Sequence, residues 1–279
     1  MSRLALPVPY YADDQVALYL GDMREVIPAL GLQADLICAD PPYQETSLPW
    51  DRWPDGWLKV AADVSRSMWC FGSQRMFFAH LHEFQSAGWR LSQDIVSRDD
   101  DGQPAIGDVC VIWEKNNGSG RQADRFRRIH EHVLHWYRGG GWRDEIYHEA
   151  IRHIPPGGVK SRTKPGEIVR KNPNDIPHAG AYRAVDWTDD GTRLMTSVIS
   201  ARSMRGKAIH PTEKPVELLT PLISYACPPG GLVLDPFAGS GSTLEAARLS
   251  GRRAIGIEAH EPYAEKAARR LAQAPLELA

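Results

Sequence analysis

The sequence has few cysteines and no long hydrophobic run, and both absences exclude classes of protein. Its four cysteines among 279 residues are isolated from one another, and no C-x-x-C pair or disulfide framework is present. No apolar run approaches the roughly 20 residues that span a bilayer. The first fifteen residues, with one Arg followed by Pro, Tyr and acidic residues, lack the pattern of a signal peptide. We therefore expect a reduced, cytoplasmic protein without membrane contact.

The charges are unevenly distributed, although the overall composition is ordinary for a globular protein. Hydrophobic residues make up 42% and charged residues 24% of the chain, and the formal net charge is −2. From Lys115 to Lys214 there are 19 Lys and Arg against 11 Asp and Glu, whereas the remainder has 14 against 24. A basic middle in an acidic frame indicates a polyanion-binding segment, although chance clustering on a solvated surface gives the same count.

Short apolar runs alternate with amphipathic stretches along most of the chain. Apolar runs at Ala17–Leu20 and Ala34–Ala39 flank an amphipathic stretch at Met23–Leu30, which is typical of a strand–helix–strand unit. The pattern predicts a doubly wound, Rossmann-like α/β fold with a mostly parallel sheet. Further strands and helices are expected at Met68–Phe71, Gln74–Ala87, Cys110–Trp113, Val216–Ala226, Leu232–Leu234, Ser242–Leu249, Arg253–Ile257 and Pro262–Leu271.

The segment 139–208 has a different character from the rest of the chain. Turn-forming sequences such as GGGW, PPGG, KPGE and NPND recur at close intervals, with little apolar periodicity. A segment of this length is more often a functional insertion than a simple connection. We therefore expect residues 1–138 and 209–279 to form one core, with 139–208 inserted as a loop-rich module.

A glycine-rich turn follows one of the predicted strands, in the sequence DPFAGSGST from Asp235 to Thr243. Its glycines allow close approach of the backbone to a ligand at a helix N-terminus. It has no Gly-Lys-Ser/Thr, and Leu244 breaks the G-x-G-x-x-G pattern, so two common nucleotide motifs are excluded. Glu258 closes the next strand, where an acid accepts hydrogen bonds from ribose hydroxyls. The carboxylate of Asp235 suits a ligand with a cationic end. The alternative interpretation is that the turn is a plain link between a strand and a helix and binds no ligand.

A second motif, Asp40-Pro41-Pro42-Tyr43, ends the strand ADLICAD. The two prolines fix an extended, rigid turn and leave carbonyl groups without competing N–H donors. An aromatic ring and a carboxylate are thereby held near each other at the edge of the sheet. This arrangement suits a flat ligand with an amino group, although a tight turn with a buried tyrosine would have the same sequence.

These motifs resemble, in type and order, those of the β-group S-adenosylmethionine-dependent DNA amino-methyltransferases. In that family a DPPY block comes first, a target-recognition region follows, and an FxGxG cofactor block comes last. Here the order is DPPY, the basic middle, HPTEKP from His210 to Pro215, and then DPFAGSGST. The resemblance covers nearly the whole chain apart from the variable middle, and it implies a methyltransferase fold and activity.

The resemblance also implies roles for individual residues. Asp40 and the Pro41 carbonyl would hold the target amino group, and Tyr43 would stack on a base flipped out of the duplex. Pro42 belongs to the same catalytic block. The residues implied for S-adenosylmethionine are Asp22, Asp40, His210, Lys214, Asp235, Phe237, Gly239, Ser240, Gly241, Ser242, Thr243 and Glu258.

The implied chemistry is direct, in-line attack of an exocyclic amine on the sulfonium methyl, without a covalent enzyme intermediate. Positioning and electrostatics would supply most of the acceleration. Methylation at cytosine carbon-5 is excluded because it needs a thiolate within a Pro-Cys pair, and no Cys here follows Pro. The segment His130-Glu-His-Val-Leu-His135 has Leu where HExxH requires a second His, so we expect no metal and a strand that carries fold or DNA contacts.

The target atom has two candidates, adenine N6 and cytosine N4. Cytosine enzymes of the β group often have Ser in place of the Asp, so Asp40 favours adenine. Two further hypotheses are methylation of RNA or of a protein amide, and non-catalytic DNA binding with a vestigial cofactor pocket.

The resemblance implies double-stranded DNA as the partner, with a homodimer and a cognate restriction endonuclease as further candidates. The insertion Ser97–Val109 has no role that the sequence reveals. The basic residues expected to contact DNA phosphates or base edges are Lys160, Arg162, Lys164, Arg170, Lys171, Arg202, Arg205 and Lys207.

Overall fold

The computed structural model describes residues 6–92, 110–119, 128–141, 145–153, 191–201 and 213–273. The chain divides into two compact units. The first comprises Met1–Ser92, Val109–Glu149 and Ser197–Ala279, and the second comprises Gln93–Asp108 and Ala150–Thr196. Within the described ranges, no helix combines the length and apolarity needed to cross a membrane.

The first unit is built from one large sheet and its covering helices. Its strands are β1 (Tyr11–Ala12), β2 (Val16–Leu20), β3 (Leu36–Ala39), β4 (Ser67–Gly72), β5 (Arg90–Leu91), β6 (Cys110–Ser119), β7 (Arg128–Tyr137), β10 (Val198–Ser200), β11 (Leu232–Asp235) and β12 (Arg253–Glu258). Its helices are α1 (Met23–Leu30), α2 (Trp57–Val64), α3 (Gln74–Ser86), α5 (Val216–Ala226), α6 (Ser242–Leu249) and α7 (Glu261–Leu271). Among the described residues the sheet has ten strands, in the order β1-β2-β12-β11-β3-β4-β7-β6-β10, with β5 beside β7.

Five neighbouring strands of this sheet, β2, β12, β11, β3 and β4, run parallel to one another. Strand β7 pairs antiparallel with β4, and β6 pairs antiparallel with β7. The carboxyl ends of the five parallel strands therefore meet along one edge of the sheet, and the amino end of β7 lies beside them.

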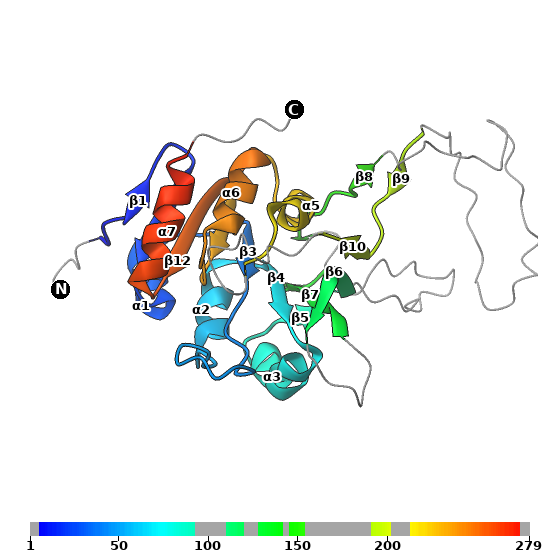
Figure 1. Ribbon diagram of the computed structural model, residues 1–279, viewed down its shortest axis with the longest axis horizontal. Helices are drawn as coiled ribbons and strands as arrows, with labels where there is room; N and C mark the ends of the chain where they lie inside the picture. The colour runs from blue at the N-terminus through cyan, green and yellow to red at the C-terminus, as the bar shows by residue number, and fades with distance from the viewer. Residues whose placement is uncertain are drawn as a thin grey trace, which may run out of the picture. The chain divides into compact units, whose positions relative to one another are not determined.

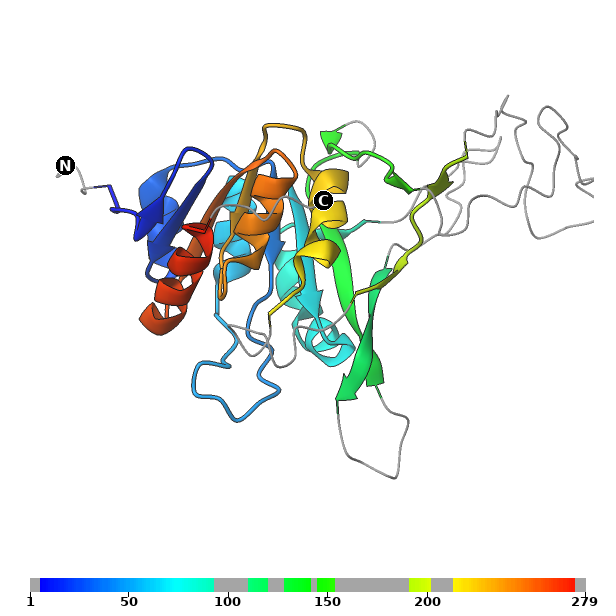
Figure 2. The same cartoon turned by 45° about the horizontal axis from the view of Figure 1, so that its top comes forward.

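The helices cover both faces of the sheet, with α1, α2 and α3 on one face and α5, α6 and α7 on the other (Figures 1 and 2). The chain passes from β3 through α2 to β4 in one direction, and from β11 through α6 to β12 in the opposite direction. The strand order thus reverses between β3 and β11. In open α/β sheets, ligands bind beyond the carboxyl ends of the strands at such a reversal.

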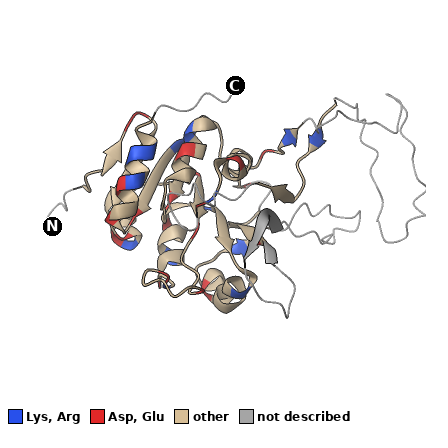
Figure 3. Ribbon diagram, in the orientation of Figure 1, with Lys and Arg blue, Asp and Glu red and all other residues tan. Residues whose placement is uncertain are grey.

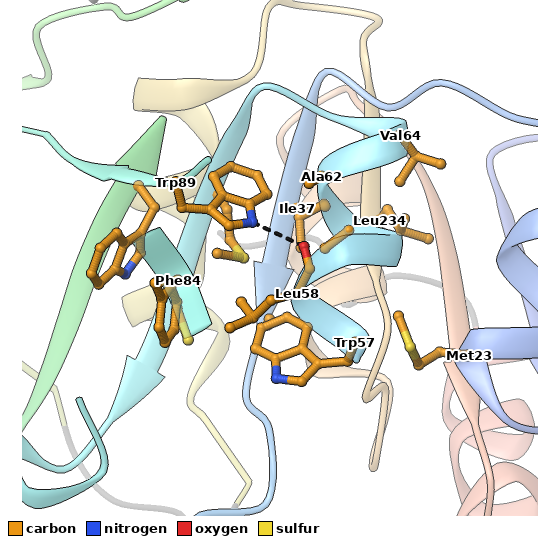
Figure 4. Close-up of a cluster of buried hydrophobic side chains, with 14 of the residues drawn as sticks. Met23, Ile37, Trp57, Leu58, Ala62, Val64, Phe84, Trp89 and Leu234 are labelled. Carbon is orange, nitrogen blue, oxygen red and sulfur yellow. Dashed lines mark hydrogen bonds between the residues drawn. The ribbon is translucent and has the colours of Figure 1, made fainter. Parts of the chain in front are cut away.

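Large apolar side chains fill the space between the sheet and the helices α1, α2 and α3 (Figure 4). Trp57 and Phe84 are fully buried there, and Phe84 stacks on Trp136 with ring centroids 4.2 Å apart. Trp89 donates its indole N–H to the Leu58 carbonyl at 3.0 Å, so its one polar group is satisfied within the core. This packing supports β3, β4 and β7 behind the edge of the sheet where their polar residues lie.

The described part of the second unit contains a short antiparallel pair, β8 (Arg152–His153) and β9 (Arg193–Leu194). Both strands carry an arginine, and both are marked as basic in Figure 3. The Arg152 guanidinium donates to the Thr192 hydroxyl at 2.6 Å. The role of residues 139–208 in target recognition stays a prediction. The boundaries expected for this segment, after residue 138 and before residue 209, also stay a prediction.

The Rossmann-like, mostly parallel α/β fold expected from the sequence is confirmed. The predicted strands and helices coincide with elements of the structure, and Cys110–Trp113 is the first part of a longer strand, β6. The apolar runs identified the strands because a sheet covered on both faces makes its central strands nearly continuously hydrophobic.

Candidate active site

Acidic residues lie at the carboxyl ends of four neighbouring parallel strands. Asp22 follows β2, Glu258 ends β12, Asp235 ends β11, and Asp40 follows β3. The order of the strands places these ends next to one another along one edge. The DPPY motif and the glycine-rich turn are far apart in the sequence, and they become neighbours because β3 pairs with β11.

The glycine-rich turn between β11 and α6 depends on backbone conformations that favour glycine. Gly239 and Gly241 have φ values of +50° and +77°. The Ala238 N–H donates to the Ile257 carbonyl at 2.8 Å, which ties the turn to β12. A Cβ on Gly241 would lie 3.3 Å from the Cβ of Ala267, so glycine also permits α7 to pack against the turn.

Glu258 is fixed by the backbone on both sides of the end of β12. Its carboxylate accepts the N–H of Gly239 and the N–H of His260, each at 2.8 Å. Burial raises the pKa of Glu258, and these backbone hydrogen bonds act in the opposite direction. An ionised carboxylate has about four lone-pair positions, so Glu258 retains acceptor capacity for the two hydroxyls of a ribose.

Asp235 is buried beneath the turn, with 4% of its surface exposed. Its carboxylate accepts the Phe237 N–H at 2.9 Å and the Thr243 hydroxyl. Burial raises the pKa of Asp235 to about 7, against the effect of these hydrogen bonds, and the negative charges of Asp40 and Glu258 add to the rise. Asp235 therefore holds the turn together from within.

Asp22 caps the first helix at the far end of this row of acids. Its carboxylate accepts the Arg24 N–H at 2.8 Å and pairs with the Arg24 guanidinium at 2.5 Å. The hydrogen bond from Arg24 lowers the pKa of Asp22, so its charge persists near neutrality. The neighbouring Gly21 N–H donates to the Glu258 carbonyl at 2.9 Å, so the ends of β2 and β12 are joined.

Arg270 on α7 connects the glycine-rich turn with the segment that precedes α5. Its guanidinium lies 2.7 Å from the carboxylate of Glu213 and also pairs with Glu245 on α6. The same group lies 3.3 Å from the Ser242 hydroxyl, which is bonded to Ser240 at 2.8 Å. Sequence reasoning missed this cluster, because it joins segments that are distant along the chain.

Asp40 lies on the other side of the strand reversal and is the centre of a compact polar cluster. The hydroxyl of Tyr43 donates to one of its carboxylate oxygens, and the ammonium of Lys214 lies 2.5 Å from the other. Burial and the charges of Asp40 and Glu131 raise the pKa of Tyr43 well above its usual value, so the phenol stays protonated. Pro41 is buried and Pro42 is half-buried.

Lys214 is buried and has a second carboxylate nearby. Its ammonium lies 3.7 Å from the Glu131 carboxylate and 5.2 Å from the centre of the Phe71 ring. Burial alone would lower the pKa of Lys214, but the charges of Asp40 and Glu131 outweigh it and the pKa is raised. Sequence reasoning missed Glu131, although an acidic residue near the end of an apolar strand was an available signal.

The loop after Tyr43 is held together by Asp51. Its buried carboxylate accepts the N–H groups of Gln44, Glu45 and Thr46 at 2.7–3.0 Å. Gln44 has φ of +58°, an uncommon conformation for a residue other than glycine. Asp51 thus fixes the path of the chain immediately beyond the DPPY motif, a function that the sequence did not reveal.

The histidines of the HEHVLH segment lie on β7, as the sequence predicts. His135 is buried, and burial lowers its pKa to about 3. Its Nε2 lies 3.0 Å from the Ser67 hydroxyl. The rings of His130 and His132 contact each other with centroids 5.2 Å apart. Across the residues that the structure describes, no group of three or more His, Cys, Asp or Glu is arranged to hold a metal.

Several sequence-predicted residues lie outside the described residues. They are His210, the insertion Ser97–Val109, and all eight basic residues expected to contact DNA: Lys160, Arg162, Lys164, Arg170, Lys171, Arg202, Arg205 and Lys207. Their roles stay predictions.

Comparison with known proteins identifies the family. A model of the N6/N4 DNA methylase family matches residues 34–269, which is most of the chain. The type II methyltransferase M.ScaI from Streptomyces caespitosus is 28% identical over 293 aligned residues, which cover 96% of this chain and 85% of M.ScaI.

Solved structures share the fold at lower identity. The complex of M1.HpyAVI with S-adenosylmethionine superposes with a TM-score of 0.58 at 22% identity, covering 91% of this chain and 99% of the other. The cytosine-N4-specific PvuII DNA methyltransferase superposes with a TM-score of 0.59 at 14% identity, covering 96% and 90%. With the family match and the row of acidic strand ends, these results lead to one conclusion: the chain belongs to the N6-adenine/N4-cytosine family of DNA methylases.

Proposed function

We propose that this protein transfers a methyl group from S-adenosylmethionine to the exocyclic N6 of an adenine flipped out of double-stranded DNA at a specific site. The observation that carries the proposal is the pairing of Asp40 with Tyr43 at the end of β3, directly beside the glycine-rich turn that follows β11. A carboxylate and an aromatic ring held together at this edge suit an aromatic amine, and the adjacent turn suits a nucleoside-like cofactor.

The residues around the turn fit S-adenosylmethionine. When bound, this cofactor supplies a methyl group on a cationic sulfur: the amine nitrogen bonds to the methyl carbon in line as the carbon–sulfur bond breaks, the neutral thioether leaves, and the nitrogen then loses one proton. Glu258 retains acceptor positions for the ribose hydroxyls. Asp22, which follows the neighbouring strand β2, accepts a hydrogen bond from the adenine amino group of the cofactor. The turn from Phe237 to Thr243 encloses the methionine part, and His210 holds its carboxylate. The resemblance also implies Lys214 for that carboxylate, but Lys214 pairs with Asp40 and lies near Glu131, so we assign it to the catalytic block.

The catalytic block prepares the target amine. The lone pair of an exocyclic amine is delocalised into the base, so the amine is a poor nucleophile. Hydrogen bonds from its two hydrogens to the Asp40 carboxylate and the Pro41 carbonyl favour a tetrahedral nitrogen with a localised lone pair, while Tyr43 stacks on the base. Flipping the base costs a few kcal/mol, which these contacts offset. Asp40 also stabilises the positive charge that develops on the nitrogen.

The test is to incubate the protein with unmethylated DNA and labelled S-adenosylmethionine, digest the DNA, and identify the modified nucleoside by mass spectrometry. We expect N6-methyladenine, because Asp40 stands where cytosine enzymes of the β group often have serine. N4-methylcytosine would overturn the choice of base and leave the mechanism of amine activation in place. Sequencing of the methylated DNA would then locate the target site.

Two other functions make different predictions for the same assay. If the substrate is RNA or a protein amide, cofactor binding is retained but no DNA is methylated. If the protein only binds DNA, Asp40→Ala has no measurable effect, whereas in an enzyme it abolishes turnover and spares DNA binding. The presence of Asp40, Tyr43, Asp235 and Glu258 together favours an enzyme over a vestigial pocket.

The partners follow from the same proposal. Double-stranded DNA is held by the basic residues of the middle segment, and neutralised phosphates make its affinity fall with salt. A homodimer and a cognate restriction endonuclease are further proposed partners, and the proposed location is the cytoplasm of a bacterial cell or of a phage-infected host. Analytical ultracentrifugation tests the homodimer, and fractionation of the native cells tests the location.

A further inference from the structure

Both oxygens of the Asp40 carboxylate already have donors in this structure. Tyr43 donates to one, and the Lys214 ammonium contacts the other at 2.5 Å. A carboxylate has about four lone-pair positions, so a target amine can still bind to Asp40, but it then shares an oxygen with the donor that is already there. Of the two donors, the Lys214 ammonium is the one that opposes the reaction, because its charge neutralises the carboxylate beside a nitrogen that becomes positive.

The second carboxylate beside Lys214 comes from the antiparallel strand β7. The pairing of β4 with β7 places Gly72 opposite His132, so Glu131 lies just beyond the carboxyl end of β4. Side chains alternate along a strand, so Glu131 shares a face with Val133 and His135. His135 contacts Trp69 and Tyr225, and Tyr225 is on α5. Glu131 therefore faces the side from which Lys214, two residues before α5, enters the site.

We propose that Glu131 is a positioning residue that accepts the Lys214 ammonium when the target amino group binds to Asp40. The inference rests on the proposed amine methylation. The ammonium lies 3.7 Å from Glu131, about 1 Å beyond the usual length of a charge-assisted hydrogen bond, so a small side-chain movement completes the exchange.

The charges explain why a second acid is needed. Lys214 is 7% exposed, and a buried ammonium that gives up a hydrogen-bonded carboxylate without gaining another is strongly destabilised. Without Glu131, Lys214 would compete with the amine for Asp40 throughout the reaction. With Glu131, the ammonium stays paired, and the three side chains together retain a net charge of −1 beside the nitrogen that becomes positive.

The experiment is a double-mutant cycle in the full-length protein. Single-turnover methyl transfer is measured on a duplex that carries the mapped target site, at saturating S-adenosylmethionine, for the wild type, Glu131→Gln, Lys214→Met and the double variant. We expect Glu131→Gln to slow transfer roughly 10- to 100-fold, because the ammonium then remains on Asp40. The double variant should be no slower than Lys214→Met, because Glu131 acts through Lys214.

Two further variants separate positioning from folding. Glu131→Asp keeps the charge and should restore much of the rate lost in Glu131→Gln. Asp13→Asn is the matched control, because Asp13 pairs with the largely buried Arg248 at the opposite edge of the sheet, before β2. It should lower the melting temperature without changing the rate. Isothermal titration should give the same affinity for S-adenosylmethionine in Glu131→Gln as in the wild type.

Three kinetic results would each overturn the proposal: an unchanged rate in Glu131→Gln, additive losses in the double variant, or no recovery in Glu131→Asp. Failure of the proposed function is distinguishable from these results, because the wild type itself would then transfer no methyl group to any DNA. If Glu131→Gln is slow and also binds S-adenosylmethionine weakly, Glu131 supports the cofactor pocket instead, and the exchange is likewise rejected.

Discussion

The two sides of the strand reversal build their parts of the site in different ways. On the β11–β12 side, the elements are main-chain N–H groups, glycines and carboxylates that the backbone holds, as in the contact of Gly239 with Glu258. On the β3–β4–β7 side, the elements are side chains, with Asp40, Lys214 and Glu131 contributed by three separate segments.

The two halves therefore depend on the fold in different ways. The turn after β11 is a local structure, fixed by a contiguous stretch of sequence and by its packing on α7. The charged cluster of Asp40, Lys214 and Glu131 forms only after the sheet has placed β3 and β7 on either side of β4 and the segment before α5 has placed Lys214 beside them. Damage to the first half should therefore weaken the binding of the cofactor, and damage to the second should slow the reaction with little effect on that binding.

The largest effect is expected from Asp40→Asn, which leaves the shape of the catalytic block and removes its charge. The rate of methyl transfer should fall by about 10³-fold, because stabilisation of the developing positive charge is lost. Affinity for S-adenosylmethionine, measured by isothermal titration, should change by less than about threefold. A comparable loss of cofactor affinity would show that the two halves are not separable.

Asp235 is expected to make stability depend on pH. Its pKa is about 7 in the folded protein against 3.8 in its ordinary state, so the folded protein binds more protons between these values. The unfolding free energy should therefore fall as pH rises from 4 to 7, by about 2–3 kcal/mol between pH 5 and pH 8. Asp235→Asn removes this contribution.

Urea unfolding of the wild type and of Asp235→Asn at pH 5 and pH 8 is the measurement. The drop in unfolding free energy between the two values should be smaller in the variant. Glu258, whose pKa is also raised by burial, titrates in both proteins, so the comparison isolates Asp235. Equal drops in the two proteins would mean that Asp235 is ionised throughout and that its burial has no energetic consequence.

A smaller effect is expected from Gly241→Ala. The added methyl would lie 3.3 Å from Ala267, and φ of +77° is strained for alanine, so the turn should shift and cofactor affinity should fall about tenfold. Gly251→Ala is the matched control, since Gly251 has φ of +71° with no atom within 4 Å of the added carbon. It should lower the melting temperature similarly without changing cofactor affinity.

The contrast between the halves also explains what the sequence could predict. The central strands, most of the helices around them and the glycine-rich turn were predictable, because apolar periodicity and turn residues are local patterns. Helix α2 and strand β10 were not expected from the sequence. The contact of Lys214 with Asp40 and Glu131 was not, because no local rule brings an antiparallel strand beside the end of β4. Arg270 was missed for the same reason, since its partners Glu213, before α5, and Glu245, on α6, lie in separate segments of the chain.

The smallest effect is expected from Tyr43→Phe, which divides the two roles of this residue. The variant keeps the ring for stacking and removes only the hydroxyl that donates to Asp40. A typical hydrogen bond contributes about 1 kcal/mol net, so methyl transfer should slow about three- to tenfold. Tyr43→Ala also removes the stacking surface and should slow it more than 100-fold, about 3 kcal/mol. Single-turnover rates at saturating cofactor make the comparison, and equal losses in the two variants would place the function of Tyr43 in its hydroxyl, as a support for the charged cluster.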